Sequence, residues 1–152
     1  MAGNIPGQLV GTSPNANYYL YVSEDVSSES PVEEQNWAAA AERADSIGID
    51  VISTSLGYNQ FDNPICNNTY ADLNGRTTLI AKAAGFAAKK GMIVVVAAGN
   101  EGANSWHYIT TPADADSILA VGAVDASGIV ASFSSYGPSS DGRVQQEIDS
   151  VG

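Results

Sequence analysis

The chain has 152 residues, which is enough for one domain with a hydrophobic core. Hydrophobic residues make up 44% of it and charged residues only 15%, which indicates a folded protein rather than a disordered one. Seventeen acidic residues against six basic ones give a net charge of −11, and this excess of negative charge argues against nucleic acid and anionic membranes as partners.

Two further classes of protein are disfavoured by what the sequence lacks. No apolar run is long enough to span a bilayer, and the first residues lack the basic and apolar segments of a signal peptide. Cys66 is the single cysteine, which excludes an internal disulfide framework and a metal site built from several cysteines. These features leave the cellular compartment open.

Strand and helix patterns alternate along most of the chain. The predicted strands are residues 18–22, 50–55, 92–96 and 117–124, the predicted helices are residues 31–47 and 77–90, and residues 129–135 are a candidate hairpin partner. This order predicts an α/β fold with three layers, in which a mostly parallel sheet with right-handed crossovers carries helices on both faces.

The start of the first predicted helix has a capping pattern. Ser30 can cap the helix, and Pro31 suits its first position. Glu33 can reach back to the backbone of Ser30, as in a capping box. This pattern predicts that the helix begins at residue 31.

The stretch that ends at Asn100 carries the strongest functional signal. Residues 92–96 form an apolar run typical of a strand covered on both faces. Side chains then shrink through Ala97, Ala98 and Gly99, so that a ligand can approach the backbone. Asn100 follows at the carboxyl end of the strand, where open α/β sheets bind ligands, and its amide can donate to a developing oxyanion. The competing interpretation is a simple turn, because this composition also favours one.

Several stretches of the chain, in this order and at this spacing, resemble the subtilisin-like serine proteases, or subtilases. They are residues 11–16, 51–57, 94–102, 118–125 and 131–137, together with Pro112. The resemblance covers about residues 7–144. It implies that residues 1–152 form a single domain with a partial subtilisin-like fold, the middle portion of a catalytic domain. Residues 145–152 depart from the family pattern, through divergence or through addition to the chain, and no role is assigned to them.

The resemblance assigns Asn100 the role of side-chain donor in the oxyanion hole. Such a donor must point to where negative charge appears in the tetrahedral intermediate. The alternative of a turn at this position is therefore set aside in favour of a catalytic role.

The resemblance also implies two walls of a substrate groove. Ser55, Leu56 and Gly57 resemble the strand end whose backbone pairs with an extended substrate. The opposite wall, which flanks the side chain before the scissile bond, consists of Ala97, Ala98 and Gly99. The floor of that pocket falls within residues 108–111, where the loop length differs from the family pattern and no single residue is assigned.

The residues of a catalytic triad are missing from this sequence. Subtilases supply them in the chain order Asp, His, Ser, and the resemblance implies that this chain begins after the histidine motif and stops before the serine motif. His107, the only histidine, lies in a loop where the family has no catalytic residue. Cys66 lies in a loop without a basic partner, so it is not expected to be a nucleophile. The chain alone is therefore expected to be inactive.

No cofactor is implied as a requirement. Residues 112–118 overlie a family segment that can bind calcium or a monovalent cation through backbone carbonyls, which leave no side-chain signature, so no metal ligand is assigned. The acidic segment 24–34 lacks the ordered ligand spacing of a calcium loop. The implied partner of the parent protein is a peptide or protein substrate, with no nucleic acid and no membrane, and the implied location is secreted or in the cell envelope.

One strand of the family sheet is expected to be absent. The strand that bears the aspartate in subtilases lies between the counterparts of residues 18–22 and 51–55, and it precedes this chain. Its absence would expose bare strand edges. Either the two strands pair directly, or a second copy fills the slot and the chain self-associates.

These observations together predict a fragment of a serine endopeptidase that cleaves peptide bonds by acyl transfer. The first alternative is a non-catalytic, subtilase-like binding or structural module, which only the flanking reading frame can distinguish. The second is an unrelated nucleotide-binding domain, disfavoured because residues 99–102 lack the spaced glycines of a dinucleotide fingerprint.

Overall fold

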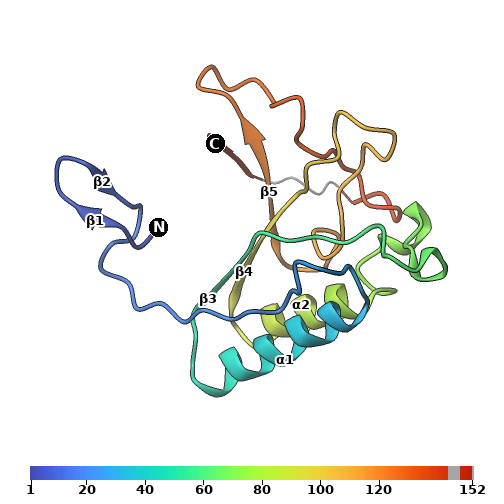
Figure 1. The fold of residues 1–152 in the computed structure, drawn as a ribbon, viewed down its shortest axis with the longest axis horizontal. Coiled ribbons are helices and arrows are strands. Elements are labelled where there is room, and N and C mark those ends of the chain that lie inside the picture. Colours follow the sequence, from blue (N-terminus) through green and yellow to red (C-terminus); the bar gives the residue numbers. More distant parts are fainter. Residues whose placement is uncertain (144–147, 152) are drawn as a thin grey trace.

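The computed structural model describes residues 1–143 and 148–151 (Figure 1). Its body consists of helices α1 (Val32–Ser46) and α2 (Leu79–Lys89) and strands β3 (Val51–Thr54), β4 (Ile93–Ala97), β5 (Leu119–Val124) and β6 (Ile148–Val151). A hairpin of β1 (Asn4–Ile5) and β2 (Leu9–Val10) precedes the body, and the short 3-10 helices η1 (Pro64–Cys66) and η2 (Tyr70–Asp72) lie in the long polar loop.

The four body strands form one parallel sheet in the order β3-β4-β5-β6. Thr54 pairs with Val96, and Val96 pairs in turn with Ala120, so alternate side chains of the strands share a face. The predicted α/β class and its parallel sheet are confirmed.

Both helices lie on the same face of this sheet (Figure 1). Thr54, Val94 and Val96 are buried on that face, whereas Val51 and Ile93, which alternate with them, are 51% and 53% exposed. The sequence predicts helices on both faces, but the described residues supply a helical layer on one only. α2 connects the adjacent parallel strands β3 and β4, and α1, which precedes β3, packs beside α2 on the same face. The connection from β4 to β5 contains no α-helix that could cover the other face.

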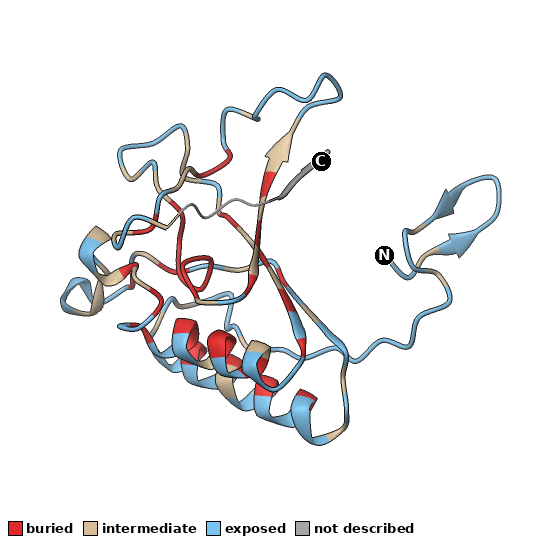
Figure 2. Ribbon diagram, turned by 180° about the vertical axis from the view of Figure 1, so that it is seen from behind, coloured by how far each residue is buried: buried red, intermediate tan, exposed pale blue. Residues whose placement is uncertain are grey.

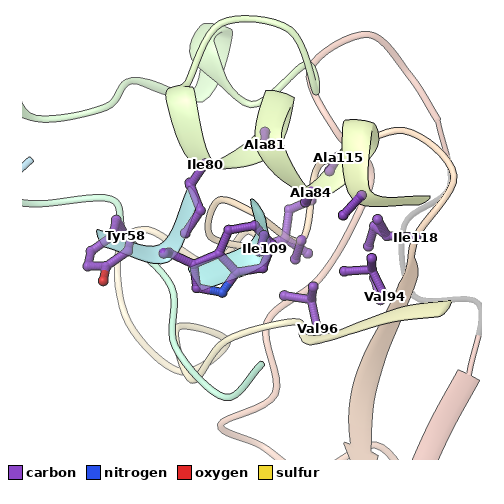
Figure 3. Packing of buried hydrophobic residues seen from close by; sticks show 14 of the residues in the cluster. Tyr58, Ile80, Ala81, Ala84, Val94, Val96, Ile109, Ala115 and Ile118 are labelled. Carbon is purple, nitrogen blue, oxygen red and sulfur yellow. The ribbon is translucent and has the colours of Figure 1, made fainter. Parts of the chain in front are cut away.

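The hydrophobic core lies between the helices and the sheet. Figure 2 shows the buried residues of α1 and α2 gathered on the sides that face the strands. Figure 3 shows Ile80 and Ala84 of α2 and Val94 and Val96 of β4 in the space between this helix and this strand, and all four belong to one hydrophobic cluster. Alanines on the facing surfaces let the backbones approach closely, and Trp37 donates from Nε1 to Thr54 Oγ1 at 3.2 Å. The core therefore fixes the adjacent strands β3 and β4 against the same pair of helices.

The predicted strand at residues 18–22 is wrong. This segment belongs to no strand, and Leu20 and Val22 are 91% and 94% exposed. Its direct pairing with residues 51–55 is also absent, and β3 lies at the edge of the described sheet. A strand requires a neighbour that satisfies its backbone groups, and the tyrosine-rich run has none in the described chain.

Three local features differ from the sequence pattern. The first residue flanking α1 is Pro31, and the helix has no side-chain cap from Ser30, although Glu33 does accept from the Ser30 N–H at 3.2 Å. Residues 129–135 contribute a single antiparallel bridge, between Val124 and Val130, rather than a strand. β6 forms within the carboxyl-terminal residues to which no role is assigned from the sequence.

Within the described residues, no helix is long and apolar enough to cross a membrane.

Two buried carboxylates support the loops around α2. Glu34, 6% exposed, accepts at Oε2 from the N–H groups of Leu79 and Ile80 at 3.1 and 3.2 Å, and thereby caps the start of α2. Asp114, with no exposed surface, accepts at Oδ2 from the Gly75 N–H at 2.7 Å. Burial is the main cause that raises the pKa of both carboxyl groups.

We expect Glu34→Gln to change how stability depends on pH. Because the folded-state pKa of Glu34 is raised, its contribution to stability is present at acid pH and is lost as the pH rises through that pKa. Glutamine keeps an oxygen for the α2 amides without the charge. In urea unfolding, the variant should therefore gain stability relative to the wild type as the pH rises above about 4, the ordinary pKa range of a glutamate.

The matched control is Glu42→Gln, an exposed glutamate on the same helix. Its stability relative to the wild type should not show this trend. A constant difference between Glu34→Gln and the wild type across this pH range would contradict the assignment.

Candidate functional site

The carboxyl ends of β3 and β4 lie side by side at the carboxyl-terminal end of the sheet, because the two strands are adjacent and parallel. β3 ends at Thr54, and the predicted backbone wall of residues 55–57 follows directly. β4 ends at Ala97, and the second predicted wall and Asn100 follow. The structure thus brings residues 55–57 and residues 97–100 to the same end of the sheet.

Thr110 lies between the two walls. A Cβ atom added to Gly57 would collide with Thr110 Oγ1, and one added to Gly99 would lie 2.9 Å from the same atom. Thr110 is 4% exposed, and its N–H donates to Ala98 O at 3.2 Å. Within residues 108–111, where the sequence predicts the pocket floor, Thr110 is the residue that packs against both Gly57 and Gly99.

The predicted site residues differ in their exposure to solvent. Ser55, Gly57 and Asn100 are exposed, Leu56, Ala97 and Gly99 are half-buried, and Ala98 is buried. Leu56 packs against the hydrophobic core, which anchors its wall.

Residues next to Thr110 connect the predicted walls to the core. Tyr58 and Thr111 exchange two backbone hydrogen bonds of 2.9 and 3.2 Å, and Thr111 Oγ1 lies 2.6 Å from Thr78 Oγ1 at the start of α2. The buried Tyr58 donates to Glu24 Oε1 at 3.3 Å, and burial followed by the charge of Glu24 raises its pKa. Tyr58 is therefore a neutral structural side chain.

His107 and Cys66 occupy structural positions. The His107 ring stacks on Tyr136 at a centroid distance of 4.6 Å, and its Nδ1 lies 3.0 Å from Gly102 O. Its backbone adopts a φ of 66°, so the residue shapes a tight turn of the loop. Cys66 is a free, half-buried cysteine at the end of η1.

Two backbone carbonyls of residues 112–118 lie against Arg143. Asp114 O accepts from Arg143 Nη2 at 2.9 Å, and Ala115 O lies within reach of Arg143 Nη1 at 3.4 Å. The same guanidinium lies 2.8 Å from carboxylate oxygens of Asp116 and Asp141. Arg143 already brings positive charge to these carbonyls. Among the described residues, no group of three or more His, Cys, Asp or Glu side chains could hold a metal ion.

Comparison with known sequences gives one consistent family. The profile of the subtilase family matches residues 1–152. Subtilisin DY from Bacillus licheniformis is 35% identical over 130 residues, which is 85% of this chain and 41% of the relative. A thermophilic serine proteinase from Bacillus sp. (strain AK1) is 39% identical over 94 residues, 62% of this chain and 19% of the relative. The match thus covers less than half the length of either relative.

Solved structures share the fold. The epidermin leader peptide processing serine protease from Staphylococcus aureus aligns over 96% of this chain and 37% of its own, with a TM-score of 0.64 and 24% identity. The prenylagaramide maturation protease PagA aligns over 78% of this chain and 37% of its own, with a TM-score of 0.59 and 25% identity. With a family match along the whole sequence and this architecture, the chain belongs to the subtilase family.

Proposed function

We propose that this chain is the middle portion of a serine endopeptidase domain, with the triad residues supplied elsewhere in a longer parent. The observation that carries the proposal is the meeting of Gly57 and Gly99 across Thr110, with Asn100 beside them at the same sheet edge. Membership of the subtilase family supports it, as does the limited share of subtilisin DY that the chain spans.

In this mechanism a serine of the parent attacks the scissile carbonyl and an oxyanion develops on its oxygen. The Asn100 side-chain amide donates a hydrogen bond to that oxygen and stabilises the tetrahedral intermediate. The backbone of residues 55–57 pairs with the extended substrate, as an added strand would. Thr110 Oγ1 limits the depth of the pocket for the side chain that precedes the scissile bond.

The proposed substrate is a peptide or protein. Protease relatives such as subtilisin DY and the maturation protease PagA support this class. The parent is proposed to be secreted or held in the cell envelope, as the family resemblance implies. A non-catalytic module that keeps the groove is the alternative, and flanking Asp, His and Ser motifs in the reading frame would exclude it.

The chain by itself should not cleave a fluorogenic peptide. Without a nucleophile, a base and an orienting carboxylate, only a low residual activity can remain. A subtilisin assayed in parallel controls for substrate quality. Turnover above background that a serine-directed phosphonate abolishes would falsify this expectation.

In the parent, Asn100→Ala should lower kcat strongly while leaving KM nearly unchanged, because the hydrogen bond strengthens in the transition state. We expect the loss known for the corresponding donor in a subtilisin, about 10²–10³ in kcat. Asn36→Ala, at an exposed asparagine on α1, is the control and should keep wild-type kinetics. Wild-type turnover in Asn100→Ala would remove this residue from the mechanism.

We further propose that the isolated chain self-associates through the outer edge of β3. Within the described residues that edge has no strand partner, and the apolar segment at residues 18–22 is exposed. Sedimentation at tens of micromolar should therefore give a species larger than a monomer. The double variant Leu20→Lys/Val22→Lys should shift it toward the monomer, and a monomeric wild type would contradict the proposal.

A further inference from the structure

The backbone on either side of Asn100 is held by hydrogen bonds. Before it, Ala98 O accepts from the Thr110 N–H at 3.2 Å, and after it, the Gly102 N–H donates to Phe133 O at 2.9 Å. The Asn100 side chain itself is exposed at the edge of the sheet. The loop thus presents an open amide on a fixed backbone.

Ser135 contacts both immediate neighbours of Asn100. Its N–H donates to Gly99 O at 3.0 Å, and its Oγ accepts from the Glu101 N–H at 2.9 Å. Ser135 has no exposed surface, so water does not readily replace the hydroxyl if it is removed. A single buried residue therefore holds the peptide groups before and after the proposed oxyanion donor.

Close packing adds a third constraint. Gly99 has a φ of +112°, a conformation that favours glycine, and a Cβ added there would lie 2.8 Å from Ser135 Oγ. The Ser135 side chain therefore lies against the Gly99 backbone with no space between them. Sequence reasoning does not find this contact, because residues 99 and 135 are far apart along the chain.

We propose that Ser135 is the positioning residue of the oxyanion hole, which sets the direction of the Asn100 amide without touching the reacting atoms. The inference rests on the proposed function of Asn100. An oxyanion donor is effective because it points at the developing charge before the reaction begins, so its loop must not rotate. The two Ser135 hydrogen bonds restrain the peptide planes that determine this direction.

The test compares Ser135→Ala with Ser134→Ala. Ser134 is the preceding residue and is 1% exposed, and its Oγ accepts from the Ala123 N–H of β5 at 3.1 Å. Each variant removes one buried hydroxyl that accepts from a backbone amide, so both should lower stability to a similar extent. Only Ser135→Ala should affect the Asn100 loop, and Ser135→Cys, which keeps the shape with a weaker acceptor, should have an intermediate effect.

The first readout uses the chain as it stands. In amide hydrogen exchange followed by NMR, Ser135→Ala should raise the exchange rate of the Glu101 amide about tenfold or more relative to Ser134→Ala. Ser134→Ala should instead raise exchange at Ala123. Equal protection of Glu101 in both variants would overturn the inference.

The second readout uses the full-length parent. Ser135→Ala should lower kcat about tenfold to a hundredfold with KM nearly unchanged, since a small misplacement of a catalytic group is costly. Ser134→Ala should keep both constants. If Asn100→Ala itself costs nothing, the proposed function fails. If Asn100→Ala lowers kcat and Ser135→Ala behaves like Ser134→Ala, only the positioning inference fails.

Discussion

The parallel pairing of β3 with β4 is the constraint on which the site depends. Their register places Thr54 opposite Val96, so both strands end at the same level of the sheet. The loops that follow them therefore lie side by side. The glycines in those loops then come close enough for Thr110 Oγ1 to lie between them. A slip of this register would move one wall relative to the other and would also turn core side chains outward.

Buried hydrogen bonds link this end of the sheet to the two helices. Thr111, next to Thr110, contacts the hydroxyl of Thr78, which itself caps α2 by accepting from the Ala81 N–H at 3.3 Å. Glu34 caps the same helix start from α1. Buried polar groups are costly unless each finds a partner, so these bonds specify one arrangement of α1, α2 and the site loops. The same residues therefore stabilise the fold and position the loops of the site.

The described chain leaves one side of its sheet open. Val51 and Ile93 remain half exposed on the face opposite the helices, and the outer edge of β3 lacks a strand. Residues 18–22 show the consequence, since their strand composition does not produce a strand without a partner. Strand propensity describes how well a residue fits a sheet that already exists, and here the sheet does not extend to that segment.

The sequence by itself determined both helices, the strands β3, β4 and β5, and the order in which the walls and Asn100 follow them. Apolar periodicity, caps and glycines act over a few residues, so they can be read locally. Only the tertiary structure decided that Thr110 packs between Gly57 and Gly99, that Ser135 contacts the backbone on both sides of Asn100, and that residues 18–22 pair with no strand of the described chain. It also formed β6, a four-residue segment that is too short to predict alone. Each of these depends on a partner distant in the chain, and a single sequence does not record which distant residues meet.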